Sequence, residues 1–120
     1  MKKLLFMPVA LVLFIVSCKK DEVFPSVEGT TWEVHLKWSS QPDTAILYTK
    51  FNAGGNGQEV TSGGTPTGTT FTWTQDDSKV TWNYTSPDIQ VTGNINNDGN
   101  YMSGTSLFGS NTGGWRAVLH

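Results

Sequence analysis

The stretch TWEVHLKW, residues 31–38, alternates apolar and polar side chains without a break. Successive side chains of a β-strand point to opposite faces of the sheet, so alternation with period two predicts a half-buried strand. The face expected to be buried consists of Trp32, Val34, Leu36 and Trp38. This stretch is the clearest indication that the chain forms an all-β domain.

Working outward from it, further stretches of strand-like composition lie between turn sequences rich in Gly, Pro, Asn and Asp. They recur at spacings of about ten residues, which is typical of an all-β domain. The Asn97-Asp98-Gly99-Asn100 turn carries the strongest hairpin signal. We expect the other strands over residues 44–52, 58–61, 70–74, 79–85, 89–96, 101–107 and 114–119.

The short connections favour an eight-stranded antiparallel up-and-down meander over residues 29–120. Each strand has one apolar face, which fits either a closed β-barrel or a two-sheet β-sandwich. We favour the barrel, because closure removes the exposed edge strands that a sandwich leaves. The sandwich is the alternative.

The N-terminus has the pattern of an export signal. Lys2 and Lys3 precede an apolar run from Leu4 to Val16, as in a signal peptide. The run is too short for a transmembrane helix, which needs roughly 20 apolar residues. We therefore predict a cleaved signal over residues 1–17 and a polar tether over residues 18–28.

The residues Ile15-Val16-Ser17-Cys18 resemble a bacterial lipobox. The resemblance implies acylation of Cys18 with palmitate-type chains, and two or more chains anchor a protein stably in a membrane. Cys18-Lys19-Lys20-Asp21-Glu22 also resembles the export tag of Bacteroidetes-type surface lipoproteins, which implies an outer-membrane lipoprotein of the cell envelope on display at the surface. A periplasm-facing anchor is one alternative, and an ordinary secreted protein with a chance cysteine is another.

Four motifs resemble those of lipocalins and of the lipocalin-like lipoproteins of Bacteroidetes. They are Gly29-Thr30-Thr31-Trp32, Phe51-Asn52-Ala53-Gly54-Gly55, Tyr101-Met102-Ser103-Gly104-Thr105 and Gly114-Trp115-Arg116-Ala117. The resemblance implies a barrel that binds a small hydrophobic ligand. It also implies that Trp32 packs against Arg116 where the barrel closes, a contact of about 0.5–2 kcal/mol. Alternation from Trp115 favours the rival, in which Arg116 points outward.

Composition and motifs argue against several functions. Of eight basic residues, Lys2 and Lys3 fall in the signal, which leaves six against ten acidic residues and argues against nucleic-acid binding. We expect no enzymatic activity, because the chain has no Gly-x-Ser-x-Gly elbow and no free cysteine nucleophile. We expect no metal and no cofactor, and we interpret Glu33 and His35 as a solvated strand face.

The apolar faces leave two functions open. A barrel of eight strands is wide enough either to be filled by its own side chains or to hold one small ligand. We favour a filled core. A pocket, if present, would be lined by Trp38, Trp73, Trp82 and Tyr84.

The first hypothesis is a membrane-anchored binder of a small hydrophobic molecule. The second is a non-enzymatic module with a filled core that binds or inhibits another protein at the envelope. In the second hypothesis the contacts would come from the glycine-rich loops 53–57, 62–68 and 108–114, because binding residues concentrate on loops held by a rigid scaffold.

Overall fold

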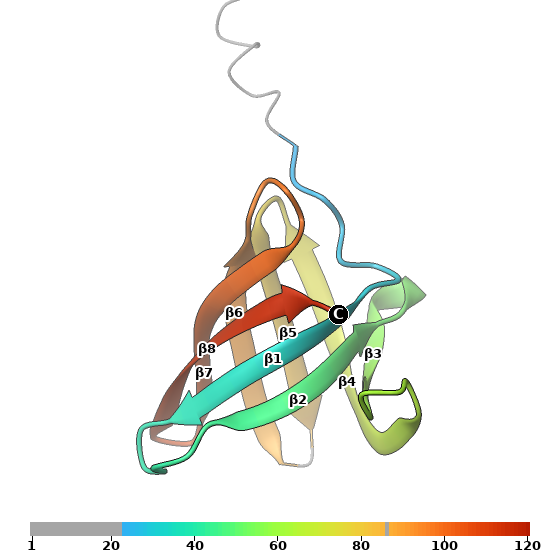
Figure 1. The fold of residues 1–120 in the computed structure, drawn as a ribbon. Coiled ribbons are helices and arrows are strands. Elements are labelled where there is room, and N and C mark those ends of the chain that lie inside the picture. The colour runs from blue at the N-terminus through green and yellow to red at the C-terminus, as the bar shows by residue number, and fades with distance from the viewer. Residues whose placement is uncertain (1–22, 86) are drawn as a thin grey trace, which may run out of the picture.

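Eight strands follow one another around a closed antiparallel barrel in the computed structural model (Figure 1), which describes residues 23–85 and 87–120. Strand β8 pairs with β1, with Leu36 opposite Trp115, and this pairing closes the barrel. The predicted up-and-down meander is confirmed and the sandwich alternative is wrong. The strands are β1 (Thr31–Trp38), β2 (Ala45–Phe51), β3 (Asn56–Val60), β4 (Pro66–Asp76), β5 (Lys79–Thr85), β6 (Asp88–Ile95), β7 (Tyr101–Phe108) and β8 (Asn111–Leu119).

Strands β4 and β8 begin three or more residues earlier than the sequence indicated. Strand β4 starts at Pro66, inside the expected loop, and pairs there with Val60. Strand β8 starts at Asn111, opposite Phe108, so only a tight turn joins it to β7. Both extensions are made of Thr, Gly, Asn and Pro, which give no apolar alternation. Backbone pairing with the neighbouring strands holds them in place.

The connections alternate between the two ends of the barrel. The β1–β2, β3–β4, β5–β6 and β7–β8 connections lie at one end, which we call the open end. The β2–β3, β4–β5 and β6–β7 connections lie at the other, the closed end. A short 3₁₀ turn, η1 (Ala53–Gly55), forms part of the β2–β3 connection. Figure 1 shows the N-terminal segment, in blue, reaching the barrel at the closed end, beside the β6–β7 connection.

The N-terminal segment closes that end of the barrel. Val27 is fully buried in the core, and Phe24 packs against the same core. Gln75 holds the segment from both sides: its Oε1 accepts from the Val27 backbone N–H at 3.0 Å, and its Nε2 donates to the Pro25 carbonyl at 2.8 Å. The expected tether over residues 18–28 is therefore too long. Residues 24–28 belong to the barrel, whereas Cys18 and the expected signal peptide over residues 1–17 lie outside the described residues.

Aromatic side chains fill the closed half. The Phe51 ring makes edge-to-face contacts with Phe71 and Trp82, with ring centroids 5.5 and 5.2 Å apart. Trp82 in turn meets Trp115 at 5.1 Å. Such contacts contribute about 0.5–1.5 kcal/mol each beyond the area they bury. The cluster forms a solid layer across the barrel between Val27 and the open end.

A glycine makes room for this layer. A Cβ at Gly57 would lie 2.1 Å from the Phe71 ring and 2.8 Å from the Lys50 carbonyl oxygen. Only a residue without a side chain lets Phe71 lie across the β3 backbone. Gly57 therefore positions an aromatic ring of the solid layer.

Candidate functional site

The open half of the barrel contains a cavity of about 760 Å³. That volume lies within the range of about 300–1,000 Å³ common for small-molecule sites. The lining is mostly apolar, and threonines from the β3–β4 region lie toward the open end. The lining includes Val34, Leu36, Leu47, Glu59, Val60, Tyr84, Ile89, Val91 and Trp115.

The favoured prediction of a filled core therefore holds for only half of the barrel. Between Val27 and the aromatic layer, the interior is occupied by side chains. On the open-end side of the layer, the inward-facing residues of β1 and β2 include the smaller side chains Val34, Leu36 and Leu47. These side chains leave space inside the barrel, and that space is the cavity. The large ring of Trp115 forms part of its floor.

An acidic side chain lies in the mostly apolar wall. Glu59 in β3 is only 6% exposed, yet it lines the cavity. It faces inward because β3 pairs with β2 in a register that places Glu59 opposite Thr49, which is also fully buried. A register irregularity between Gln58 and Val60 buries Val60 as well, although Val60 is the next residue in the chain.

A short chain of hydrogen bonds holds the Glu59 carboxylate. The Thr49 hydroxyl donates to it at 3.0 and 3.2 Å, and the Tyr84 hydroxyl donates to its Oε2. The Trp82 indole N–H donates to the Tyr84 hydroxyl oxygen at 3.1 Å. An indole nitrogen can only donate, so the Tyr84 proton is directed to Glu59.

Burial shifts the pKa values of both Glu59 and Tyr84. Desolvation raises the pKa of Glu59 above its ordinary value, and the hydrogen bonds from Tyr84 and Thr49 partly oppose that rise. Desolvation, with the neighbouring Glu59 charge, raises the pKa of Tyr84 far above its usual range. Tyr84 therefore remains a neutral donor, and Glu59 is the group in the cavity that can change charge.

The four predicted pocket residues separate into two pairs. Trp38 and Tyr84 line the cavity, Trp38 at the open end, where it contacts Phe108 with ring centroids 6.4 Å apart. Trp82 lies in the aromatic layer beneath, with 1% exposure. Trp73 lies at the closed end and donates to the carbonyls of Asn52 and Asn56 at 2.9 and 2.8 Å. Trp82 and Trp73 therefore support the barrel and do not line the cavity.

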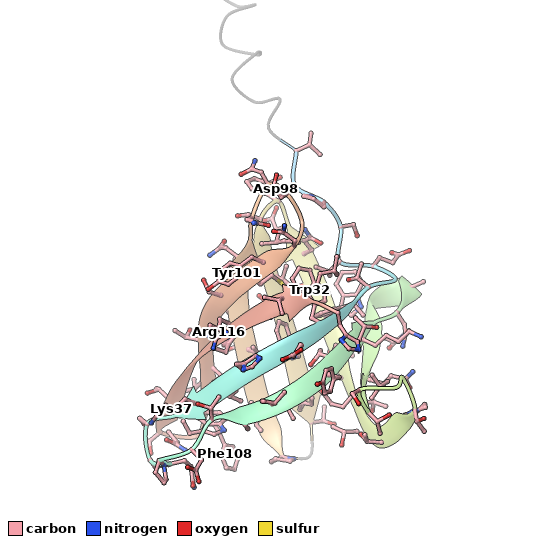
Figure 2. The ribbon with its side chains drawn as sticks, in the orientation of Figure 1. Trp32, Lys37, Asp98, Tyr101, Phe108 and Arg116 are labelled. Carbon is pink, nitrogen blue, oxygen red and sulfur yellow. The ribbon has the colours of Figure 1, made fainter. Side chains whose placement is uncertain are left out.

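The structure has Arg116 pointing outward, as the alternation from Trp115 favoured, and not in the contact with Trp32 that the resemblance implied. Trp32 is buried in the core, and its indole N–H donates to the Thr30 hydroxyl at 2.8 Å. Arg116 is exposed on β8, opposite His35 of β1 (Figure 2). Arg116 follows Trp115, which points inward, so alternation sends the guanidinium to the outer face. The barrel closes by backbone pairing of β1 with β8 instead.

The three glycine-rich loops do not form one surface. Residues 53–55 form η1 at the closed end, whereas the loops at residues 61–65 and 109–110 lie at the open end. Glu33 and His35 lie on the outer face of β1, where His35 Nε2 is 2.7 Å from a Glu33 carboxylate oxygen. Over residues 23–85 and 87–120, no cluster of three or more His, Cys, Asp or Glu is placed to hold a metal.

Sequence reasoning missed Glu59. Strand β3 is short, and its glycine, glutamine, glutamate and valine give no alternation that would assign Glu59 to the inner face. The available signal was Thr49, which shares the inner face of β2 with Leu47 and Phe51 and marks a polar position inside the barrel.

No family model, curated protein or solved structure matches this chain. Within the part of the chain that the structure describes, no helix is long and apolar enough to cross a bilayer.

Proposed function

We propose that the domain binds a small, largely apolar molecule in the cavity of its open half. The observation that carries the proposal is the combination of a mostly apolar cavity of ligand size with a buried carboxylate, Glu59, in its wall. Binding sites for small molecules commonly combine an apolar lining with a few fixed polar groups. The resemblance of four motifs to lipocalin-like lipoproteins supports the same proposal.

The site is largely preformed. The aromatic layer beneath the cavity is fixed by edge-to-face contacts, and Glu59 is fixed by Thr49 and Tyr84. A preformed site loses less conformational entropy when it binds, which favours affinity.

Binding of the neutral, apolar dye Nile red tests this proposal. We expect its fluorescence to rise on addition of the domain and to saturate at one dye per chain. Leu47→Trp places an indole in the cavity and should abolish the rise. Val118→Trp, on the outer face of β8, is the matched control and should leave it unchanged. Equal binding by the wild type and the Leu47→Trp variant would mean that the dye binds elsewhere.

We also propose that Cys18 is acylated and anchors this binder in the cell envelope, in the outer membrane. The lipobox-like residues 15–18 support it. Full-length protein expressed in a bacterium should enter the membrane fraction with the added mass of its acyl chains. A Cys18→Ala variant should lose that mass. Recovery of the wild type without the added mass would refute the anchor.

A further inference from the structure

Glu59 has no basic partner among the residues the structure describes. Lys50 on β2 directly follows Thr49, which is paired with Glu59. Because Thr49 faces inward, Lys50 lies on the outer face, where it is paired with Gln58. The groups that hydrogen-bond to Glu59 are neutral hydroxyls. The remaining cationic or titratable basic side chains of residues 23–85 and 87–120 are absent from the cavity lining, and they are His35, Lys37, Lys79, Arg116 and His120.

The carboxylate also has hydrogen-bonding capacity left over. An ionised carboxylate offers about four acceptor positions. Three hydrogen bonds, two from the Thr49 hydroxyl and one from Tyr84, take up most of them and leave about one position. Glu59 lines the cavity, so a ligand in the cavity lies beside this carboxylate.

A buried carboxylate without a counter-charge is costly, and a cation bound beside it removes that cost. Building on the proposed function, we propose that the cavity binds an amine with an apolar body, and that its ammonium group donates hydrogen bonds to Glu59. The bound amine would supply the positive charge that the barrel lacks at this position.

The rest of the lining suits such a ligand. Val34, Leu36 and Leu47 provide an aliphatic wall on β1 and β2, against which an alkyl or aryl group can pack. Tyr84 and Trp115 present aromatic rings to the same cavity, and ring faces attract ammonium groups. A carboxylate ligand, such as a fatty acid, would instead meet the like charge of Glu59 and is disfavoured.

The proposal predicts a definite pH dependence. Ammonium binding needs ionised Glu59, so affinity should fall as pH falls through the raised pKa of that group. Tyr84 on β5 is the other titratable group that bonds to Glu59, and it stays neutral. Lys50 and the exposed Asp88 lie on the strands packed nearby but outside the cavity lining.

The test compares octylamine with 1-octanol by isothermal titration calorimetry, using the wild-type domain and two variants. Glu59→Gln keeps the shape of the side chain and removes its charge. Glu28→Gln makes the same change at an exposed position of the closed end and is the matched control. Charge-assisted hydrogen bonds are about twice as strong as neutral ones, so the wild type and Glu28→Gln should bind the amine about tenfold more tightly than the alcohol.

Glu59→Gln should bind the two ligands with similar affinity, while still binding Nile red, which reports that the cavity persists. In the wild type, the preference for the amine should decline as pH falls through the raised pKa of Glu59. Equal affinity of the wild type for amine and alcohol, with Nile red bound, would overturn the amine assignment and leave the proposed function standing. Failure of the wild type to bind Nile red, amine and alcohol alike would overturn both.

Discussion

At the scale of single residues, Glu59 makes the stability of the barrel depend on pH. Its pKa is raised in the folded state from a reference of 4.5. A raised acid pKa means that the folded state holds its proton more tightly than the unfolded chain does. The contribution of Glu59 to the free energy of unfolding is therefore full below about pH 4.5. It is lost as pH rises through the folded-state pKa.

Urea denaturation across this pH range measures that loss. The wild type should lose stability relative to Glu59→Gln as pH rises, because the amide carries no charge to bury. Glu28→Gln should track the wild type at every pH. A constant difference between the wild type and Glu59→Gln across the range would mean that the Glu59 pKa is the same in both states.

Gly57 gives a second test at this scale. Gly57→Ala forces a Cβ against the Phe71 ring and the Lys50 carbonyl. Overpacking of this kind costs about 1–3 kcal/mol of unfolding free energy. Gly114→Ala, where an added Cβ meets no atom within 4 Å, should change stability by less than about 0.5 kcal/mol. Thermal and urea unfolding would measure both, and equal stability of the two variants would contradict the role given to Gly57.

At the scale of elements, the N-terminal segment is part of the barrel. Val27→Ala removes two methyl groups from a fully buried position, and we expect a loss of about 2 kcal/mol in unfolding free energy. Val23→Ala, at a position 79% exposed, is the matched control and should be nearly neutral. If both substitutions proved neutral in urea denaturation, residues 24–28 would be a tether after all.

The sequence predicted elements wherever side-chain alternation carries information. Strands β1 and β5 were expected from Thr31 to Trp38 and from Lys79 to Thr85, and the structure has the same bounds. Prediction failed where a strand is held by backbone pairing alone, as at Pro66 and Asn111. It also failed for Val27, because the three apolar residues of that segment, Val23, Phe24 and Val27, do not alternate with polar residues as those of a strand would.

The candidate site was harder to predict than the fold. Tyr84 and Trp38 were found because they continue clear apolar faces. Glu59 was missed because a shift of one residue in register exchanges the two faces of a strand. The irregularity in β3 then hides which face is buried. The cavity itself depends on how far the Trp115 and Trp82 rings extend across the barrel, which a pattern of residue types does not specify.

At the scale of the whole molecule, the barrel has a solid half and a hollow half. The N-terminal segment from Val23 reaches the barrel at the solid half (Figure 1). The cavity lies in the other half, toward the open end. Figure 2 shows Asp98 at the closed end, near that segment. Thr61 lies at the opposite, open end.

This polarity predicts the orientation on a membrane. Acylated protein carrying Asp98→Cys or Thr61→Cys can be labelled with a donor fluorophore and inserted into vesicles with an acceptor in the lipid headgroups. Energy transfer should be stronger from position 98 than from position 61. Stronger transfer from position 61 would mean that the cavity faces the bilayer.

The central claim is that the hollow half of the barrel holds a small molecule. Native mass spectrometry of the protein, isolated without denaturation from the organism that makes it, tests this claim most directly. We predict an added mass that is lost on denaturation, is present in Val118→Trp and is absent from Leu47→Trp. A wild-type protein that carries no added mass in repeated preparations, or the same added mass in Leu47→Trp, would contradict the account.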